Sequence, residues 1–226
     1  SCVIQDCIMP FEITTALGST TTFSYCLFEN VNRPIKATSG SAGSIIIDNC
    51  IITDSFWASV FLGGESIIQN SEMNLNSGTL FFENSTFTIV NCDFTANNFI
   101  EGSALIAVAG ASGNITGCTF SNNFQDSGGA ILLQGCDVVS FTGCVISGNT
   151  VAFPRWANSG GIEIDNNSSN GTTEIPRLVD TTICNNDVAN INSPAFISGT
   201  VTISDTCPEN TCVGDIDGDG DVDIAD

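Results

Sequence analysis

The sequence predicts an all-β protein that folds as a right-handed parallel β-helix of about eight coils, and three observations support this prediction. A Cys-x-Phe/Ile-x-x-Asn pattern starts at Cys92, Cys118 and Cys144, at successive intervals of 26 residues. Short runs of Ile, Val, Phe and Thr alternate with clusters of Gly, Asn, Ser and Asp, as strands alternate with turns. No sustained 3.6-residue periodicity indicates a helix. One coil of about 22 to 26 residues cannot bury its own apolar face, so the coils are expected to stack about 4.8 Å apart.

Stacking places each residue above the equivalent residue of the preceding coil. Residues that recur at one interval therefore share one structural role. Cys118 and Phe120 are expected to point into the core. Asn123 is expected at a corner, where it hydrogen-bonds the Asn of the next coil. Looser copies extend the array, some with Ser or Thr in place of Cys. They are Asp6-Cys7-Ile8, Tyr25-Cys26-Leu27, Asn49-Cys50-Ile51, Asn70-Ser71-Glu72, Asn84-Ser85-Thr86 and Asp180-Thr181-Thr182.

One coil is expected to carry an insertion, because Cys144 and Thr181 are 37 residues apart. Two stretches are candidates for it, residues 151–159 and the polar residues 165–172. The array of coils is expected to end near residues 201–203.

The chain contains 11 cysteines. Most occupy one position of the repeat, so they are expected to be buried thiols that behave as small hydrophobic side chains. Cys207 and Cys212 lie outside the repeat and are close enough in sequence to pair across a short loop.

The charge of the chain restricts its partners. There are 25 acidic and four basic residues, and the net charge is −21. This excess of acid disfavours binding to nucleic acid and to anionic membranes, which need Lys and Arg. The chain contains no His, the commonest general base and zinc ligand. No run of about 18 apolar residues predicts a membrane-spanning helix. The first residues already follow a strand-like pattern, so the N-terminus is expected to be a cut or mature boundary.

Two short motifs alternate in the middle of the chain. The first is Phe94-x-x-Asn97 and Phe120-x-x-Asn123; the second is Ser127-Gly128-Gly129-Ala130-Ile131 and Ser159-Gly160-Gly161-Ile162. Together they resemble the FxxN and GGA(I/L/V) signatures of polymorphic outer membrane protein repeats, over roughly residues 80–190. That resemblance implies a β-helical surface or secreted protein, often an adhesin.

Residues 215–226 match the twelve-position calcium loop of an EF-hand. A hard cation takes six to eight oxygen ligands, and carboxylates at alternate positions converge as such a loop wraps around it. Gly220 permits the sharp turn and Val222 supplies an apolar anchor. The alternative is an acidic, disordered tail. The expected ligands are Asp215, Asp217, Asp219, Asp221, Asp223 and Asp226, with Asp221 acting through its carbonyl oxygen.

Asp226 at the twelfth position and the preceding Cys212-Val213-Gly214 resemble the first calcium repeat of a dockerin-type module. That family has two such loops, each followed by a helix, so the chain is expected to be a truncated piece. The lone loop is expected to bind Ca²⁺ weakly, above micromolar dissociation constants. A complete module would imply a cohesin-like protein partner.

Two functions remain open. Many parallel β-helices are polysaccharide lyases or glycoside hydrolases, and a hydrolase needs two carboxylates about 5 to 9.5 Å apart. Glu163 and Asp165 lie two residues apart on one expected strand and so face the same side, where they are interpreted as solvated acids. Trp156 beside Arg155 is either a sugar-stacking platform or an anchor for the insertion. A lyase would use Arg155 or Arg177, but the four basic residues are scattered along the chain.

The preferred interpretation is a secreted or cell-surface protein with a β-helix at residues 1–206 and a connector and truncated calcium loop at residues 207–226. The expected function is a non-catalytic, monomeric scaffold that adheres to a surface protein or binds polysaccharide. A carbohydrate-active enzyme is the alternative. Ca²⁺ is the expected cofactor and no catalytic residue is assigned. Carbohydrate contacts are expected from Arg155, Trp156, Glu163 and Asp165.

Overall fold

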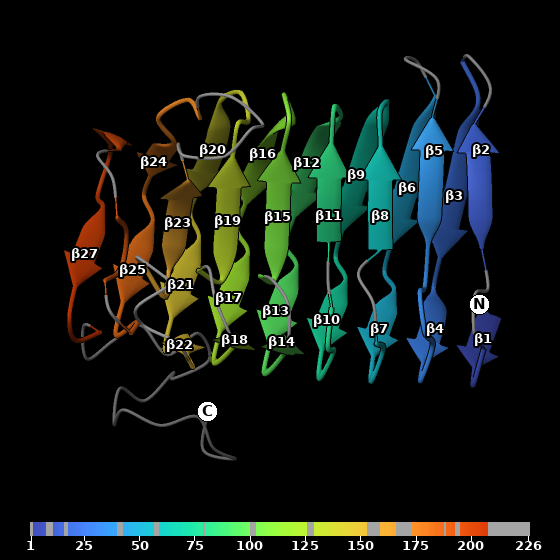
Figure 1. Cartoon of the computed structure of the whole chain (residues 1–226), viewed down its shortest axis with the longest axis horizontal. Coiled ribbons are helices and arrows are strands. Elements are labelled where there is room, and N and C mark those ends of the chain that lie inside the picture. Colours follow the sequence, from blue (N-terminus) through green and yellow to red (C-terminus); the bar gives the residue numbers. More distant parts are fainter. Residues whose placement is uncertain are drawn as a thin grey trace.

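The computed structural model describes most of the chain, and within that part coils stack side by side along one long axis (Figure 1). No helix long and apolar enough to cross a membrane is found in this part of the chain. The described ranges are residues 2–7, 11–15, 18–39, 43–56, 59–78, 80–99, 103–125, 129–152, 159–165, 173–187, 189–192 and 195–207.

The strands form four parallel sheets. Sheet A contains β1 (Cys2–Gln5), β4 (Cys26–Glu29), β7 (Ile51–Thr53), β10 (Glu72–Asn74), β13 (Asp93–Thr95), β17 (Thr119–Ser121), β21 (Val145–Ser147), β25 (Thr182–Cys184) and β27 (Thr202–Ser204). Sheet B contains β2 (Glu12–Thr15), β5 (Lys36–Ser39), β8 (Ser59–Leu62), β11 (Leu80–Glu83), β15 (Leu105–Val108), β19 (Ile131–Gln134) and β23 (Ile162–Asp165). Sheet C contains β3 (Thr20–Ser24), β6 (Ser44–Asp48), β9 (Glu65–Gln69), β12 (Thr86–Val90), β16 (Ser112–Thr116), β20 (Val139–Thr142), β24 (Arg177–Val179) and β26 (Phe196–Ser198). The small sheet D contains β14 (Asn98–Phe99), β18 (Phe124–Gln125) and β22 (Thr150–Val151).

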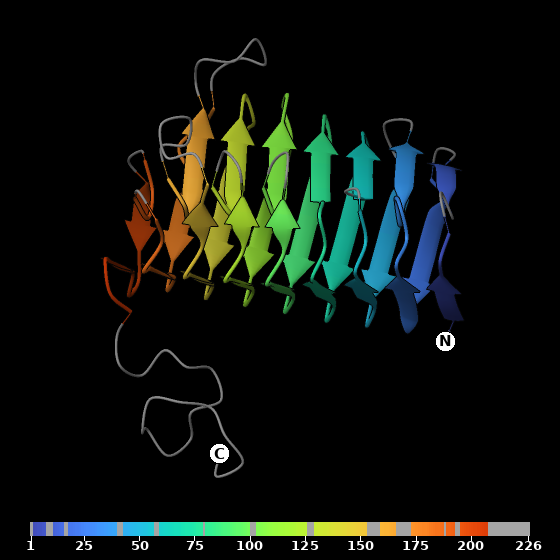
Figure 2. The same cartoon turned by 60° about the horizontal axis from the view of Figure 1, so that its bottom comes forward.

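The chain visits sheets A, B and C in turn and then starts the next coil, as Figure 2 shows from a second side. Neighbouring strands of one sheet are therefore one coil apart in sequence. Among the described residues the three main sheets have nine, seven and eight strands. The predicted parallel β-helix of about eight coils is confirmed.

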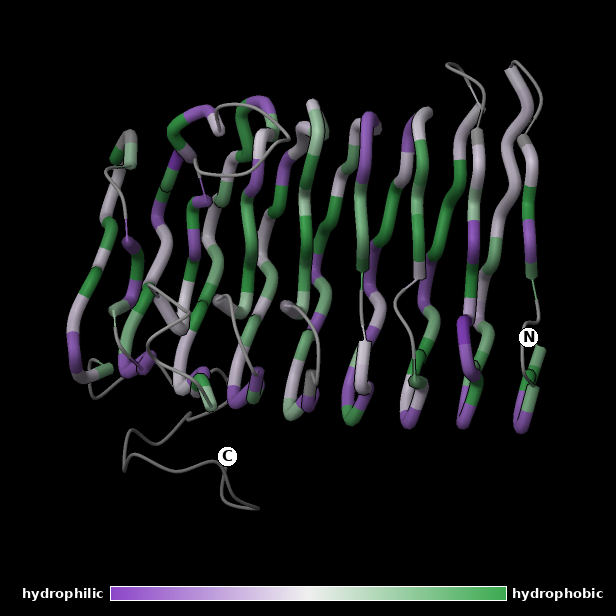
Figure 3. The backbone as a smooth tube through the Cα atoms, in the orientation of Figure 1, coloured by the Kyte–Doolittle hydropathy of each residue, from purple (hydrophilic) through white to green (hydrophobic). Residues whose placement is uncertain are grey.

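Alternating side chains fill the interior of the coils. In β12, Phe87 and Ile89 are buried while Thr86, Thr88 and Val90 are not. Figure 3 shows this pattern as hydrophobic segments that recur at the same level in successive coils. Burial of this repeated inner row drives the stacking, because one coil alone would leave it in water.

The predicted alignment of repeats is confirmed in sheet A. Phe94 pairs with Phe120 between β13 and β17, and Phe120 pairs with Ile146 between β17 and β21. Cys118 is 1% exposed and Phe120 is fully buried, so both point into the core as expected.

Left-handed backbone geometry marks both ends of the short sheet A strands from β4 to β25. In one coil Asn91 has φ 51° before the strand and Ala96 has φ 54° after it. The equivalents in the next coil are Gly117 at 60° and Asn122 at 52°. Asn and Gly tolerate this conformation better than other residues, which explains their recurrence at the corners.

The predicted asparagine contacts between coils are also confirmed. Asn123 Nδ2 donates to Oδ1 of Asn149 (2.9 Å) and to the carbonyl oxygen of Phe94 (2.9 Å). Asn123 Oδ1 accepts hydrogen bonds from the backbone N–H and Nδ2 of Asn97, at 3.1 and 2.9 Å. The same pattern links buried amides from Asn76 through Asn186, so each side chain satisfies backbone groups that the corner would leave unpaired.

Two of the looser repeat copies were assigned wrongly. In the first coil, Cys2 and not Cys7 aligns with Cys26, because β1 pairs with β4 in that register. The Asn84-Ser85-Thr86 copy belongs to sheet C, where Thr86 pairs with Glu65 and Ser112. The sheet C corner repeats a similar polar-then-apolar pattern, so sequence similarity alone could not tell the two corners apart.

The insertion is divided between both candidate stretches. In the preceding coil, Leu105 pairs with Ile131 and Asn114 with Ser140, each 26 residues on. In the enlarged coil, Ile131 pairs with Ile162, 31 residues on, and Ser140 pairs with Arg177, 37 residues on. Five additional residues therefore precede β23 and six follow it.

The expectation of buried thiols holds for five of the ten described cysteines: Cys50, Cys92, Cys118, Cys136 and Cys144 are free and buried. The predicted pairing of Cys207 with Cys212 is wrong. Cys207 forms a disulfide with Cys184, whose Cα lies 5.0 Å away. Coil stacking brings β25 and the segment after β27 together, which proximity along the sequence does not show. A second disulfide joins Cys2 and Cys26.

Candidate functional site

Several of the candidate residues lie outside the described part of the chain. These are Arg155 and Trp156, and all six aspartates expected to bind calcium, within residues 208–226. Among the described residues, no group of three or more His, Cys, Asp or Glu side chains is arranged to hold a metal ion.

Glu163 and Asp165 lie on the same side of β23, as expected. They continue the outward-facing rows of Leu132 and Gln134 on the neighbouring strand β19. Asp165 accepts a hydrogen bond from Gln134 Nε2 at 2.8 Å. Glu163 is only 5% exposed, so its interpretation as a solvated acid is wrong. The alternation along the strand correctly predicted that Glu163 points outward from the coil, but it carried no information about whether other residues cover that side chain.

A groove of about 470 Å³ runs over the outer face of sheet C. Strands β9, β12, β16, β20 and β24 form it, and it therefore extends along the axis of the solenoid. Its lining residues are mostly hydroxyl, amide and charged side chains. They are Glu65, Thr86, Phe87, Thr88, Ser112, Gly113, Asn114, Val138, Ser140 and Arg177.

Strand register aligns the polar side chains of the groove. Thr88 pairs with Asn114, Asn114 with Ser140, and Ser140 with Arg177. Neighbouring parallel strands lie about 4.8 Å apart, so this row presents a hydroxyl, an amide, a hydroxyl and a guanidinium at regular steps.

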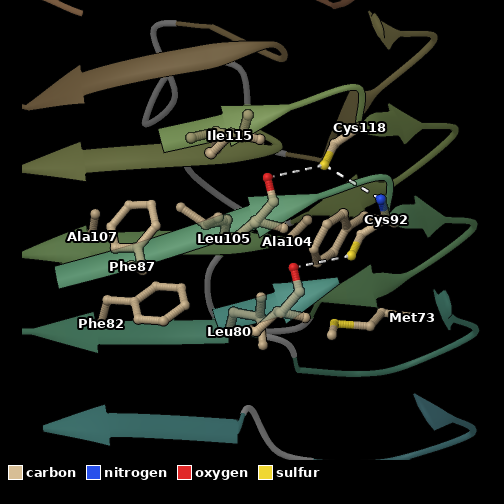
Figure 4. Close-up of a cluster of buried hydrophobic side chains, with 14 of the residues drawn as sticks. Met73, Leu80, Phe82, Phe87, Cys92, Ala104, Leu105, Ala107, Ile115 and Cys118 are labelled. Carbon is tan, nitrogen blue, oxygen red and sulfur yellow. Dashed lines mark hydrogen bonds between the residues drawn. The ribbon is translucent and has the colours of Figure 1, made fainter. Parts of the chain in front are cut away.

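Phe87 and Gly113 form the floor of the groove. A Cβ on Gly113 would overlap the ring and carbonyl oxygen of Phe87, so only glycine fits at this point of β16. The Phe87 ring stacks on Phe82, with centroids 4.4 Å apart and an interplanar angle of 23°. Figure 4 shows these two rings side by side within the core. Glycine at this position therefore lets the buried Phe87 ring pack directly against the backbone of β16.

The two ends of the groove carry opposite charge. Glu65 lies at the β9 end and Arg177 at the β24 end, four strand steps or about 19 Å away. Glu65 Oε2 accepts a hydrogen bond from Ser44 Oγ at 3.1 Å. Among the described residues, Lys36 forms an ion pair with Glu12 at 2.6 Å, whereas no carboxylate lies within ion-pair distance of Arg177. The Arg177 side chain is exposed at this end of the groove.

A comparison with protein families agrees with this architecture. The family described as "Right handed beta helix region" matches residues 1–129, which is more than half of the chain. The chain belongs to the right-handed β-helix family. The sequence matches no curated protein.

The right-handed β-helix continues past the matched residues with the same register. Strands β19 to β27 add to the ends of the four sheets by parallel pairing. The family assignment describes the fold, and the groove chemistry is a property of this chain's own outward-facing residues.

The groove of this β-helix was not predicted from the sequence, although a signal for part of it exists. Thr88, Asn114 and Ser140 are separated by 26 residues, the same interval as the Cys-x-Phe/Ile-x-x-Asn pattern. Their outward direction follows from alternation with buried neighbours. Arg177 escapes this pattern because the insertion precedes it.

Proposed function

We propose that this β-helix is a non-catalytic scaffold that binds carbohydrate along the sheet C groove. The observation that supports this most directly is the in-register row of Thr88, Asn114, Ser140 and Arg177. Hydroxyl and amide groups both donate and accept hydrogen bonds, which suits a ligand rich in hydroxyl groups. Their regular spacing suits a ligand that is itself extended and repetitive.

The composition of the groove supports the same choice. The lining is mostly hydroxyl, amide and charged side chains, and Gly113 leaves the backbone of β16 accessible to a ligand within the polar row. The net charge of −21 disfavours nucleic acid as the occupant. A polysaccharide chain lying along the solenoid axis would contact several coils at once.

We place the protein outside the cell or on its surface. The disulfides Cys2–Cys26 and Cys184–Cys207 support this, because disulfides persist mainly in oxidising compartments. The resemblance to polymorphic outer membrane protein repeats would make the scaffold an adhesive one. This finer assignment rests on the short motifs alone.

The aspartates of residues 215–226 would add a calcium-dependent attachment element. Six Asp residues around Gly220 offer the hard oxygen ligands that Ca²⁺ prefers. The resemblance to a dockerin-type repeat extends this proposal to docking on a cohesin-like protein, with the β-helix held at a surface through the loop.

The groove proposal is tested by titrating the protein with a panel of neutral and acidic polysaccharides. Substituting Asn114→Ala is expected to weaken binding at least tenfold, because it removes a donor and an acceptor from the centre of the row. Thr95→Ala on the outer face of sheet A is the matched control and should bind as the unmodified protein does. Absence of binding to the whole panel, or equal binding by both variants, would refute the proposal.

A carbohydrate-active enzyme remains the second candidate, on one specific observation. Glu163 is an almost fully buried carboxyl two residues from Asp165 on one face of β23. Alternate residues of a strand lie about 6.7 Å apart, within the spacing that glycoside hydrolases use. Reducing ends released from a polysaccharide, and abolished by Glu163→Gln, would favour this function. Persistent turnover by that variant would exclude Glu163 from it.

A further inference from the structure

Three thiols occupy the same position in three consecutive coils. Cys92, Cys118 and Cys144 immediately precede β13, β17 and β21, which pair in register. Each is 1% exposed. Adjacent parallel strands place equivalent Cα atoms about 4.8 Å apart, within the 4.4 to 6.8 Å range that a disulfide spans.

The chain already uses this position for a cross-link elsewhere. Cys2 and Cys26 pair in register between β1 and β4, and their disulfide joins Cα atoms 4.7 Å apart. Cys50 holds the same position in the next coil, but its neighbours are the cross-linked Cys26 and the hydroxyl of Ser71. Cys50 therefore lacks a free thiol beside it, whereas Cys118 has one on either side.

The Cys118 sulfur lies against the backbone of Cys92. The backbone N–H of Cys92 donates to Cys118 Sγ at 3.4 Å. Figure 4 shows the two side chains one above the other in adjacent coils. Interaction with the Cys92 side chain and burial raise the pKa of the Cys118 thiol above its usual range, and interaction with the Cys118 side chain lowers the pKa of Cys92.

We propose that Cys118 is the site of a further inter-coil disulfide, formed with Cys92 or with Cys144 by exchange with a small-molecule disulfide. Cys118 lies between the other two, so only one of the two bonds forms in any molecule and one thiol is left over. The cross-link would join coils that also carry the groove, because Cys92, Cys118 and Cys144 each follow one of Thr88, Asn114 and Ser140 by four residues.

The exchange is balanced without any other reactant. The Cys92 thiolate attacks one sulfur of the small disulfide, that S–S bond breaks, and the first small thiol leaves. The Cys118 thiolate then attacks the Cys92 sulfur of the mixed disulfide and releases the second small thiol. The two cysteine protons go to the two released thiols, and two electrons reduce the small disulfide. Both sulfurs are buried, so the exchange takes place while the coils are open, before folding is complete.

The test is to refold the reduced, denatured chain with a mixture of oxidised and reduced glutathione. Remaining thiols are then alkylated and the disulfides are mapped by peptide mass spectrometry. The expected result is a Cys92–Cys118 or Cys118–Cys144 peptide pair, with Cys50 alkylated. Closing a loop of this size is expected to raise Tm by on the order of 5 °C.

Cys118→Ser is the informative variant, because serine already occupies the equivalent position at Ser71 and accepts the Cys50 N–H bond at 3.0 Å. It should lose both peptide pairs and the rise in Tm. Cys50→Ser is the matched control and should retain them. The proposal is overturned if Cys92, Cys118 and Cys144 are all alkylated in molecules that contain the Cys2–Cys26 disulfide. A disulfide between Cys118 and a cysteine other than Cys92 or Cys144 would also overturn the proposal. The disulfide map of the unmodified chain decides between these outcomes even if a variant does not fold.

Discussion

The rings of Phe94 and Phe120 lie parallel, with centroids 4.4 Å apart and an interplanar angle of 2°. They occupy one register position in consecutive coils, and both are fully buried. Parallel stacking of identical side chains is a direct result of repeating a sequence at one interval in a parallel β-helix. The two rings cover one another, and Met73 and Ile146 continue the apolar row on either side.

Replacing Phe120 with Asp is expected to unfold the central coils. It removes a buried ring from the stack and places a carboxylate where no cation is available, which costs about 4 kcal/mol or more. Thermal unfolding followed by far-UV circular dichroism measures the effect. Phe120→Leu keeps an apolar side chain of similar size and should lose much less. If the Asp variant melts with the unmodified protein, the stacked-coil interpretation of this segment is wrong.

Removing the Asn123 side chain should destabilise the fold strongly without disturbing the core. Asn123→Ala leaves the Asn97 backbone N–H and the Phe94 carbonyl without this partner, and it removes one of the two acceptors of Asn97 Nδ2. Unpaired buried polar groups cost about 1 to 3 kcal/mol each. Asn122 has φ 52°, so Asn122→Gly is a tolerated neighbouring control. Urea unfolding of the two variants should separate them by at least about 2 kcal/mol; equal midpoints would contradict the ladder's role.

The buried thiols predict a loss of stability at alkaline pH. Burial raises the pKa of Cys144 to about 12 from an ordinary value of 9.0. The unfolded chain therefore releases the proton at lower pH than the folded chain. The stabilising contribution is complete below pH 9 and falls as pH rises toward 12, by about 1.4 kcal/mol per unit for each such thiol.

Urea midpoints measured between pH 8 and 11 test this linkage. Cys144→Ser removes one titrating group while retaining a hydroxyl, as in the Ser71 coil, and should flatten the decline. Cys7→Ser alters an exposed thiol and serves as the control. Parallel curves for all three proteins would show that Cys144 does not contribute.

The calcium loop proposed at residues 215–226 predicts one bound Ca²⁺ per chain. Asp219→Asn replaces a charged ligand near the middle of the loop and should weaken binding at least tenfold, because carboxylate charge determines much of the affinity of such sites. Isothermal titration calorimetry measures both proteins. Asp205→Asn, outside the loop, is expected to leave the affinity unchanged. Unaltered heats for Asp219→Asn would point to an unstructured acidic tail.

Much of the fold could be predicted because its information is periodic. A 26-residue interval of Cys, Phe and Asn specifies which residues stack, and alternation within strands specifies which face inward. The same reasoning misplaced Asn84-Ser85-Thr86 and the first coil, where a short match fits two corners equally well. The 26-residue interval is broken at the insertion, so it did not predict that Arg177 continues the polar row of sheet C. Nor did the strand pattern predict that Glu163 is buried.

The sequence by itself determined the parallel β-helix, the inward direction of Cys118 and Phe120, and the corner role of Asn123. Each of these depends on local pattern and on a repeat that any stacked arrangement must obey. Only the tertiary structure decided the partner of Cys207, the burial of Glu163 and the groove over sheet C. These depend on which coils lie against one another and on what fills the space above a strand, and residues far apart in the chain determine both.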